Sequence, residues 1–481
     1  MTTAPAGPSL AADTFGWDTA FAIPVQNTNA AIVRAGSSPP GFSGTGTDPL
    51  SGATYTVSGT FGPWQVALGG SGALINFAIP ISTLTLKTSV RQVSFTGGEV
   101  GIQIRLHYLP QAAAAGPAQG TLHDLKVKGT TADKIDDPVA TILALQFPDP
   151  KFNAISGAIT PVLAEWFNDH LVDFDHVFAT VNLNRTADKG QFAWLLPTAT
   201  SYAFISPATN PTPANSYLGI LNMTQGRSAT GLNQELSPNI VPAGSIAGFL
   251  ISSERLLSDL LLPNLPTVFP GCQTADFTLA NDRLSLSLSQ PVKLTPVTPT
   301  GASNPSNQSY SPHLLTLTIA LLDQTIQFTA ETRVDVNSYT QAFKSIQATY
   351  SIVLCTLPNG QQSLQFNCLG KTDNSWTVTS PGAVIEQIVL DVIIALGTIL
   401  LAVVTDGAGL VVGMVVLGLL GTMVNITPEL VATLGTNDAP SLSLLAFNAT
   451  DTIIWADQKD FPLTFAGLNE SLQLGGTPDF S

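Results

Sequence analysis

Apolar and polar residues alternate in short runs along two stretches of the chain. The first stretch, residues 55–128, contains YTVSGTF, LINFAIP and EVGIQIRLHYL, and the second, residues 275–380, contains RLSLSLSQ and TIQFTAETRVDV. Successive side chains of a β-strand point to opposite faces, so this alternation predicts strands with one buried face. Gly and Pro separate the runs of the first stretch, which therefore predicts an antiparallel meander. The second stretch predicts a further β-rich region.

A spacing of three to four residues replaces the alternation between residues 152 and 174. The apolar residues on this stripe are Ile155, Ile159, Val162, Leu163, Trp166, Phe167 and Leu171. The stripe predicts an amphipathic helix, which Pro161 should either kink or begin. Residues 248–265 predict a strand followed by a second helix, with Ser252 or Ser253 as its N-cap. The buried face of this second helix consists of Leu256, Leu257, Leu260 and Leu261.

The most apolar part of the chain is residues 384–424. Asp391 interrupts its first run, and its second run, residues 408–424, is rich in glycine. A membrane-spanning helix needs about 20 predominantly apolar residues and is usually flanked by basic ones. No Lys or Arg lies between Lys371 and Lys459. We therefore expect a buried helical hairpin packed on a curved sheet. Two alternatives are a hairpin that leaves the core to enter lipid and a permanent membrane span.

Composition narrows the possible partners. Only 11% of the residues are charged and the net charge is −15, whereas typical soluble domains have about 25% charged residues. Nucleic acid is therefore not an expected partner, because phosphates require clustered Lys and Arg. An acidic surface also disfavours docking on anionic lipid by charge alone, so any transient membrane contact should be apolar. The N-terminus has no apolar signal segment, which predicts a protein that is cytoplasmic or released without a classical signal peptide.

Candidate chemistry is sparse. Cys355 and Cys368 flank a Pro-Asn-Gly turn, and they are either bridged across a hairpin or two buried thiols. His170 and Asp173 lie one helical turn apart, but no third ligand has a recognisable spacing. The sequence contains neither a GxSxG nucleophile elbow nor a P-loop. We therefore expect no catalytic residues, no metal and no cofactor.

Several short motifs carry a family resemblance. They are TFGWDTAFAIPVQNTNAAI (14–32), HVFATVNL (176–183), WLLPT (194–198), YLGILNM (217–223), GFLISSERLLSDLLLPNL (248–265) and GLNESLQLGG (467–476). In order and spacing they resemble the 47-kDa accessory protein family of the OrfX-type gene clusters of botulinum neurotoxin. That family is similar to the tubular lipid-binding (TULIP) superfamily.

The resemblance and the patterns together predict an α+β fold. Elongated, strongly curved antiparallel sheets would wrap around long helices, with the apolar helical hairpin near residues 384–424 buried against them. The order of sheet and helix occurs roughly twice along the sequence. We expect an N-terminal half, 1–265, and a C-terminal half, 266–481, either as two units or as one continuous domain.

The resemblance implies a non-enzymatic protein that binds lipid or another hydrophobic ligand between helix and sheet. On the helical stripes, the candidate lipid-binding residues are Ile159, Leu163, Trp166, Phe167 and Leu260. The competing interpretation of each residue is simple core packing, because most apolar stripes are core. A protein scaffold or chaperone for toxin-cluster proteins is one alternative function. A membrane-inserting effector that uses residues 384–424 is another.

Overall fold

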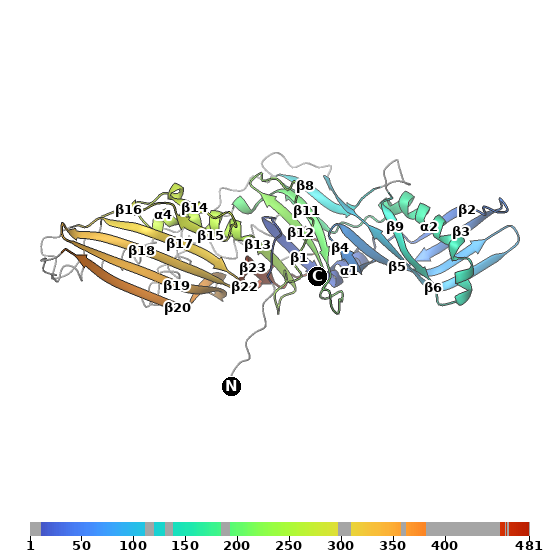
Figure 1. The fold of residues 1–481 in the computed structure, drawn as a ribbon. Helices are drawn as coiled ribbons and strands as arrows, with labels where there is room; N and C mark the ends of the chain where they lie inside the picture. The colour runs from blue at the N-terminus through green and yellow to red at the C-terminus, as the bar shows by residue number, and fades with distance from the viewer. Residues whose placement is uncertain are drawn as a thin grey trace, which may run out of the picture.

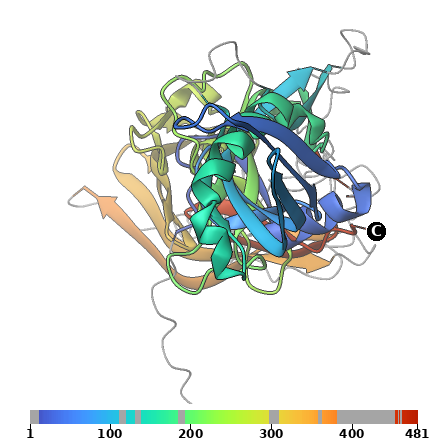
Figure 2. The ribbon, with the colours of Figure 1, turned by 90° about the vertical axis from the view of Figure 1, so that its right-hand side faces the viewer.

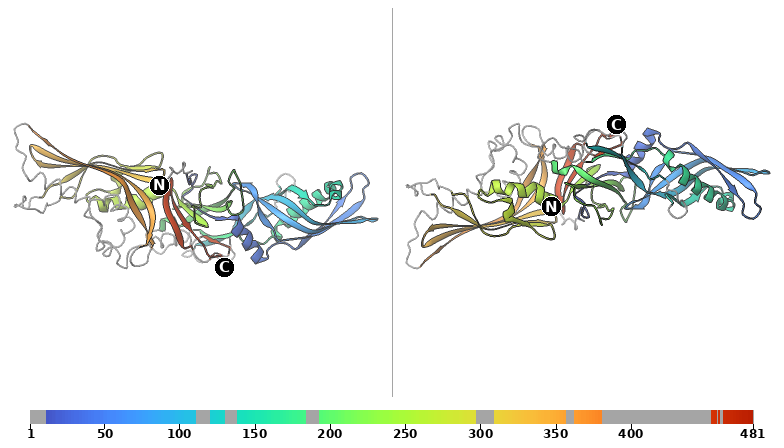
Figure 3. Two further views of the ribbon diagram at one scale, coloured as in Figure 1. Left: turned by 90° about the horizontal axis from the view of Figure 1, so that it is seen from below. Right: turned by 90° about the horizontal axis from the view of Figure 1, so that it is seen from above.

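Antiparallel β-sheets dominate the structure, which is a computed structural model. It describes residues 11–110, 120–129, 138–183, 193–296, 309–356, 362–380, 453–456, 458 and 461–480. The strands of these ranges form four sheets. Two of them form the ends of an elongated molecule, and the other two lie between these ends (Figure 1). The first and last strands of the chain, residues 19–24 and 471–476, both lie near the middle of the long axis, and the two ends of the molecule are formed by separate sheets (Figure 3).

The N-terminal sheet forms one end of the molecule and has the strand order β2-β3-β5-β6-β9, with β4 also paired to β5. Its strands are β2 (Gly41–Thr47), β3 (Thr54–Phe61), β4 (Gln65–Ser71), β5 (Leu74–Lys87), β6 (Gln92–Ile104) and β9 (Ala140–Gln146). The 15-residue helix α2 (Ser156–His170) contacts both edge strands, β2 and β9. Seen along the long axis, α2 (green) lies against the strands of this sheet (blue) (Figure 2).

The central sheet joins the two ends of the sequence. It has the order β11-β12-β1-β13-β23-β22, so strands that precede and follow residue 265 share one sheet. Its strands are β1 (Thr19–Pro24), β11 (Pro197–Ile205), β12 (Tyr217–Thr224), β13 (Ala247–Ile251), β22 (Leu463–Asn469) and β23 (Ser471–Gly476). Helix α1 (Val25–Ala35) follows β1 directly and ends at Gly36, whose left-handed backbone (φ 58°) terminates the helix.

A four-stranded sheet lies beside the central one, in the order β21-β10-β8-β7. Its strands are β7 (Leu106–Pro110), β8 (Thr121–Val127), β10 (Ala179–Leu183) and β21 (Ile453–Trp455). The hydroxyl of Tyr202, on β11, connects this sheet with its neighbours: it donates to the Ala73 carbonyl (2.8 Å) and accepts from the Leu106 amide (2.8 Å). Burial raises the pKa of Tyr202 to about 12.

The C-terminal sheet forms the other end of the molecule. Its strands are β14 (Phe277–Leu279), β15 (Ser285–Leu288), β16 (Val292–Lys293), β17 (Pro312–Leu322), β18 (Thr325–Asn337), β19 (Thr340–Thr356) and β20 (Gln362–Thr379). Burial alternates residue by residue along β18 and β19, as the alternating sequence predicts for strands with one face in the core.

Short helical turns connect the sheets. They are the 3-10 helices η1 (Pro150–Ala154), η2 (Leu171–Asp173), η3 (Ala193–Leu195), η5 (Leu262–Asn264) and η6 (Thr274–Asp276), the α-helical turns α3 (Ser253–Arg255) and α4 (Leu265–Val268), and the π-helix η4 (Leu256–Leu261). Ser252 caps α3, since its hydroxyl accepts from the Arg255 amide.

The predicted α+β fold, with sheets wrapped around long helices, is wrong. The part of the chain that the structure describes is mostly β-sheet, and its longest helix, α2, has only 15 residues. The predicted helix after Ser252 is divided into α3, η4, η5 and α4. Pro263 and Pro266 lie in this segment, and each removes an amide that a continuous helix would need. The four leucines predicted for its inner face are nevertheless buried.

The predicted apolar hairpin at residues 384–424 lies outside the described residues. Within the described ranges, no helix is long and apolar enough to cross a membrane. The disulfide question is answered by strand register: Cys355 lies opposite Ser363, and Cys368 lies opposite Tyr350. The two cysteines are therefore several residues out of register along one strand pair, and a bridge between them is excluded.

Candidate functional site: a groove beside helix α2

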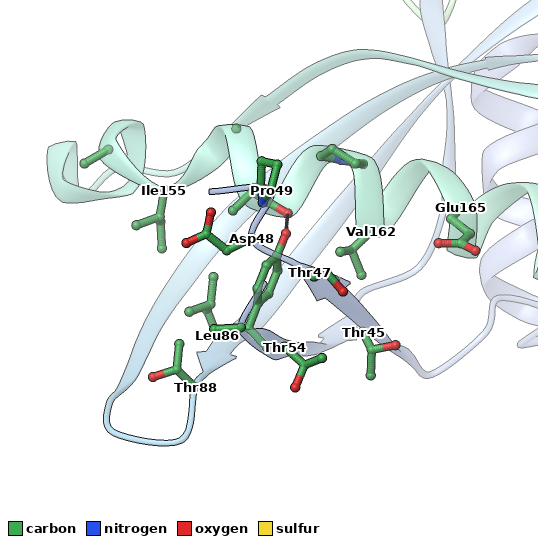
Figure 4. Close-up of a pocket in the computed structure, with 17 residues that line it drawn as sticks. Thr45, Thr47, Asp48, Pro49, Thr54, Leu86, Thr88, Ile155, Val162 and Glu165 are labelled. Atoms are coloured by element: carbon green, nitrogen blue, oxygen red, sulfur yellow. Dashed lines mark hydrogen bonds between the residues drawn. The ribbon is translucent and has the colours of Figure 1, made fainter. Parts of the chain in front are cut away.

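A groove runs between α2 and the β2–β3 hairpin, with a cavity volume of about 920 Å³. Its lining consists of Thr45, Gly46, Thr47, Asp48, Pro49, Ala53, Thr54, Tyr55, Leu86, Thr88, Ala154, Ile155, Gly157, Ala158, Pro161, Val162 and Glu165. Figure 4 shows Ile155, Val162 and Glu165 following one another along α2, across from the strand residues Thr45, Thr54 and Leu86. We call this feature the α2 groove.

Glycines in β2 allow the walls of the groove to approach each other. A Cβ atom on Gly44 would lie 2.6 Å from Cγ1 of Val162, and one on Gly46 would lie 2.4 Å from the Tyr55 ring. Both distances are too short for real side chains, so residues 44 and 46 have to be glycine for α2 and Tyr55 to pack on this strand. The GFSGTGT sequence of β2 thus has a packing role.

A hydrogen bond from Tyr55 closes one side of the α2 groove. Pro161 lies inside α2, and because proline has no N–H it cannot donate to the carbonyl of Gly157, four residues earlier. In the same helical turn, the Tyr55 hydroxyl donates to the carbonyl of Ala158 (2.9 Å). The hydroxyl therefore fixes strand β3 to the turn of α2 that the proline weakens.

The lining is largely uncharged. Its charged side chains are the carboxylates Asp48 and Glu165, and it contains no Lys, Arg or His. Hydrogen bonds from the Ser51 hydroxyl and the Leu50 amide lower the pKa of Asp48, so its carboxylate already stabilises the β2–β3 turn. A phosphate or carboxylate ligand would find no cation among the lining side chains, whereas apolar and neutral amphipathic groups would find matching surface.

Four of the five sequence-predicted ligand residues lie on α2, next to the α2 groove, and none of the five is in its lining. Ile159, Leu163, Trp166 and Phe167 are on the face of α2 that packs into the core, with at most 6% of their surface exposed. Trp166 and Phe167 pack against aromatic residues from the sheet, among them Phe61, which stacks on Phe167 and lies tilted to Trp166. Leu260 lies on η4, a different element, and is also buried. Their role in lipid binding stays a prediction.

The residues on the flank of α2 were not predicted from the apolar stripe. Ile155 and Val162 belong to the predicted stripe, but Gly157, Ala158 and Pro161 give no periodic signal. The run of small residues in β2 was the available clue, because small residues in a strand often mark a close approach of another element.

A second polar feature, the Asp18 cluster, is buried where the start of β1 and the ends of its neighbours β12 and β13 lie side by side. Asp18 precedes β1 and is only 1% exposed. Its carboxylate accepts from Arg227 Nη1 (2.5 Å) and Arg255 Nε (3.1 Å), and from the amide (2.8 Å) and hydroxyl (3.0 Å) of Thr224. Four hydrogen bonds thus satisfy this buried charge.

Further ion pairs extend the Asp18 cluster toward the C-terminal sheet. Glu254 accepts from Arg227 (2.8 Å) and from Arg283 (2.7 Å), which lies between β14 and β15. Asp259 accepts from Arg255 (2.7 Å). Three arginines and three carboxylates therefore balance one another. They connect the start of β1 with later parts of the central sheet and with the C-terminal sheet. The Gly-Trp-Asp sequence of residues 16–18 supplies Asp18, and the Ser-Glu-Arg sequence of residues 253–255 supplies Glu254 and Arg255.

In the part of the chain that the structure describes, no group of three or more His, Cys, Asp or Glu side chains is arranged to hold a metal ion. His170 instead stacks on Trp166 at a centroid distance of 5.0 Å, and its Nδ1 lies 3.0 Å from the Trp166 carbonyl.

The fold of this chain is similar to that of solved P47 proteins and places it in the same fold class. P47 from Clostridium botulinum A2 superposes with a TM-score of 0.63 at 16% identity, covering 97% of this chain and 98% of that one. P47 of C. botulinum E1 gives 0.62 at 15% identity, with 97% and 100% covered. At these identities the likeness concerns the fold alone.

The chain belongs to the OrfX-like family, described as Protein OrfX2/OrfX3/P47, whose model matches residues 14–476. Its relatives include OrfX3 of Paraclostridium bifermentans, 29% identical over 96% of this chain and 98% of that protein, and OrfX3 of C. botulinum (strain Kyoto / Type A2), 28% identical over the same shares. The family resemblance to accessory proteins of toxin gene clusters is therefore confirmed.

Proposed function

We propose that this protein is a non-enzymatic binding protein that holds an apolar or amphipathic ligand, such as a lipid acyl chain, in the α2 groove. The observation that carries the proposal is the cavity of about 920 Å³ with a lining of aliphatic, aromatic and threonine side chains. Its size lies within the range of about 300–1,000 Å³ that is usual for small-molecule sites.

The chemistry of the lining supports an acyl chain over a compact polar metabolite. Ile155, Val162 and Leu86 provide aliphatic surface, while the polar side chains are mainly threonines at the rim. Each buried methylene group contributes about 0.8 kcal/mol, so ten of them would contribute about 8 kcal/mol before the cost of association. Micromolar or weaker affinity is the expected result.

The lining also supports a binding role in preference to catalysis. A hydrolase or transferase site needs a nucleophile or a general base within hydrogen-bond reach of the substrate. Asp48 is engaged by its own turn. The other carboxylate, Glu165, has no Cys, Ser or His beside it in the lining with which it could form a catalytic pair. Membership of the OrfX-like family fits a binding role, because the short motifs that carry the family resemblance are structural and lie mainly in strands and helices.

Position 157 allows a matched test. A Cβ atom added to Gly157 meets nothing within 4 Å, so Gly157→Leu should fill the groove without disturbing the fold, whereas Gly157→Ala should leave most of the volume free. A fluorescent NBD-labelled fatty acid would be titrated into the wild-type chain and both variants, and native mass spectrometry would detect any lipid that co-purifies.

We expect wild type and Gly157→Ala to bind alike and Gly157→Leu to bind at least about tenfold more weakly, because two or more methylene contacts are lost. Equal binding by all three chains would place the ligand elsewhere. Failure of the wild-type chain to bind would overturn the proposal and would favour the scaffold role for toxin-cluster proteins.

A further inference from the structure

Two aliphatic side chains project from the end of the N-terminal sheet and are almost fully exposed. Leu50, in the β2–β3 turn, is 97% exposed, and Val90, in the β5–β6 turn, is 91% exposed. Among the large hydrophobic residues that the structure describes, the next most exposed is Tyr339 at 63%. Single exposed apolar residues are common, but two such residues on neighbouring hairpins form a defined surface. We call it the hairpin tip.

Strand register places the two turns side by side. Strand β3 pairs directly with β5, and Thr56 lies opposite Lys87, so both hairpins close at the same end of the sheet (Figure 1). Asp48 and Thr88, which begin the two turns, both line the α2 groove, and Figure 4 shows them at the same end of it. The hairpin tip therefore adjoins one end of the groove.

Both turns hold their aliphatic residue in the same way. The Leu50 amide donates to the Asp48 carboxylate (3.0 Å), and the Val90 amide donates to the Thr88 hydroxyl (3.3 Å). Turns favour Gly, Asn, Asp, Ser and Pro for conformational reasons that do not apply to Leu or Val. Since these side chains neither form the turn nor enter the core, their exposure has no explanation in folding.

The charges of the hairpin tip differ from those of the whole chain. Lys87 and Arg91 lie on either side of Val90 and are exposed, and Asp48 supplies a carboxylate to the neighbouring Leu50 turn. These two cations against one carboxylate contrast with the net charge of −15 for the whole chain. The neighbouring exposed residues of these strands are mostly hydroxylic, such as Thr54, Thr56 and Ser89. Exposed aliphatic tips with adjacent cations match a membrane surface, which presents anionic headgroups above an apolar interior.

We propose that the hairpin tip docks on a lipid membrane, with Leu50 and Val90 entering the boundary between headgroups and acyl chains while Lys87 and Arg91 contact anionic headgroups. A protein partner is less favoured, because a stable interface buries about 800 Å² on each side and depends on central anchor residues. A fluid bilayer needs no matching shape and can accept two separate side chains. This docking does not require that the α2 groove hold a ligand.

Co-sedimentation of the purified full-length chain with vesicles tests the proposal. One set of vesicles would be phosphatidylcholine alone, and the other would be phosphatidylcholine mixed with phosphatidylserine. The variants are Leu50→Ser with Val90→Ser, and Lys87→Glu with Arg91→Glu. The matched control is Leu322→Ser, which removes a 49% exposed leucine at the β17–β18 turn, away from this end of the molecule.

Removing each aliphatic side chain should weaken vesicle binding by about tenfold, because transfer of a Leu or Val side chain out of water is worth roughly one decade in affinity. The Leu50/Val90 double variant should therefore bind both vesicle types far less than wild type. The Lys87/Arg91 double variant should lose only the preference for phosphatidylserine. Leu322→Ser should behave as wild type.

Two results would overturn the proposal. In the first, the wild-type chain binds neither vesicle type, as expected if the hairpin tip faces a protein partner. In the second, the Leu50/Val90 double variant binds as well as wild type, which would assign membrane contact to another part of the chain. The fatty-acid titration of the Gly157 variants is read out without vesicles, so docking and groove binding can fail independently.

Discussion

Replacing Asp18 by asparagine should loosen the central sheet more than any change to a surface ion pair. The substitution keeps the shape of the side chain but removes the buried charge that faces Arg227 and Arg255. One end of Asp18 accepts from Thr224 and the other from the two guanidinium groups. An asparagine has only one acceptor oxygen, so its NH₂ group must face donors at one of these ends.

The expected destabilisation is about 3 kcal/mol, the lower end of the range for removing one partner of a buried ion pair. The lower end applies because both arginines keep another carboxylate: Arg227 keeps Glu254 at 2.8 Å, and Arg255 keeps Asp259 at 2.7 Å. A destabilisation of this size corresponds to roughly a hundredfold change in an opening equilibrium.

Hydrogen exchange followed by mass spectrometry is the suitable assay, because a chain of 481 residues is not expected to unfold in two states. The peptide that covers β1 should exchange roughly a hundredfold faster in Asp18→Asn. The matched control is Asp175→Asn: Asp175 is 75% exposed where it pairs with Lys126 at 2.5 Å, and the loss of such a pair should cost less than about 1 kcal/mol. Similar exchange of β1 in both variants would refute the reasoning.

Three further predictions concern stability. Tyr202→Phe removes the hydroxyl that bonds two backbone groups, the Ala73 carbonyl and the Leu106 amide. The substitution should lower the free energy of unfolding by about 2 kcal/mol and lower the thermal midpoint. The control Tyr339→Phe, at an exposed turn, should leave the thermal midpoint unchanged. Gly248→Ala would place a Cβ 2.0 Å from the Ile240 carbonyl and should cost more than about 2 kcal/mol; a stably folded variant would contradict the packing described. Burial and two nearby aspartates raise the pKa of Glu470. The folded state therefore binds a proton on the Glu470 carboxylate more tightly than the unfolded state does. The stability that this proton contributes is lost as the pH rises through the folded pKa. Glu470→Gln should therefore raise the thermal midpoint at neutral pH, and the gain should vanish below the ordinary pKa of 4.5; a gain that persists in acid would contradict this sign.

Local patterns predicted the strands well and the helices only in part. The alternation in residues 55–128 and 275–380 corresponds to real strands, because each residue of a half-buried strand faces either core or solvent. The stripe on residues 152–174 correctly identified the buried face of α2. The same stripe could not show where the helix would stop, or that the leucines after Ser252 would be buried in short helical turns.

The candidate site was predicted on the right element but on the wrong face. A stripe of large apolar residues identifies the side of a helix that meets the core, and this is where Trp166 and Phe167 lie. A groove forms instead on the flank, where Gly157 and Ala158 leave space beside Tyr55. Whether such space stays open depends on how the neighbouring strand packs, and no periodicity in one segment contains that information.

The order of residues along the chain was enough to predict which side chains of each strand and helix would be buried, that charge would be scarce, and which family the chain resembles. Those properties depend on side-chain type at positions close together in the chain. The folded arrangement was needed to show that Asp18 contacts Arg227 and Arg255, more than 200 residues away. It was also needed to show that two hairpins expose Leu50 and Val90 at one end of the groove. Such contacts depend on strand order and register over long separations, which packing of the whole molecule fixes.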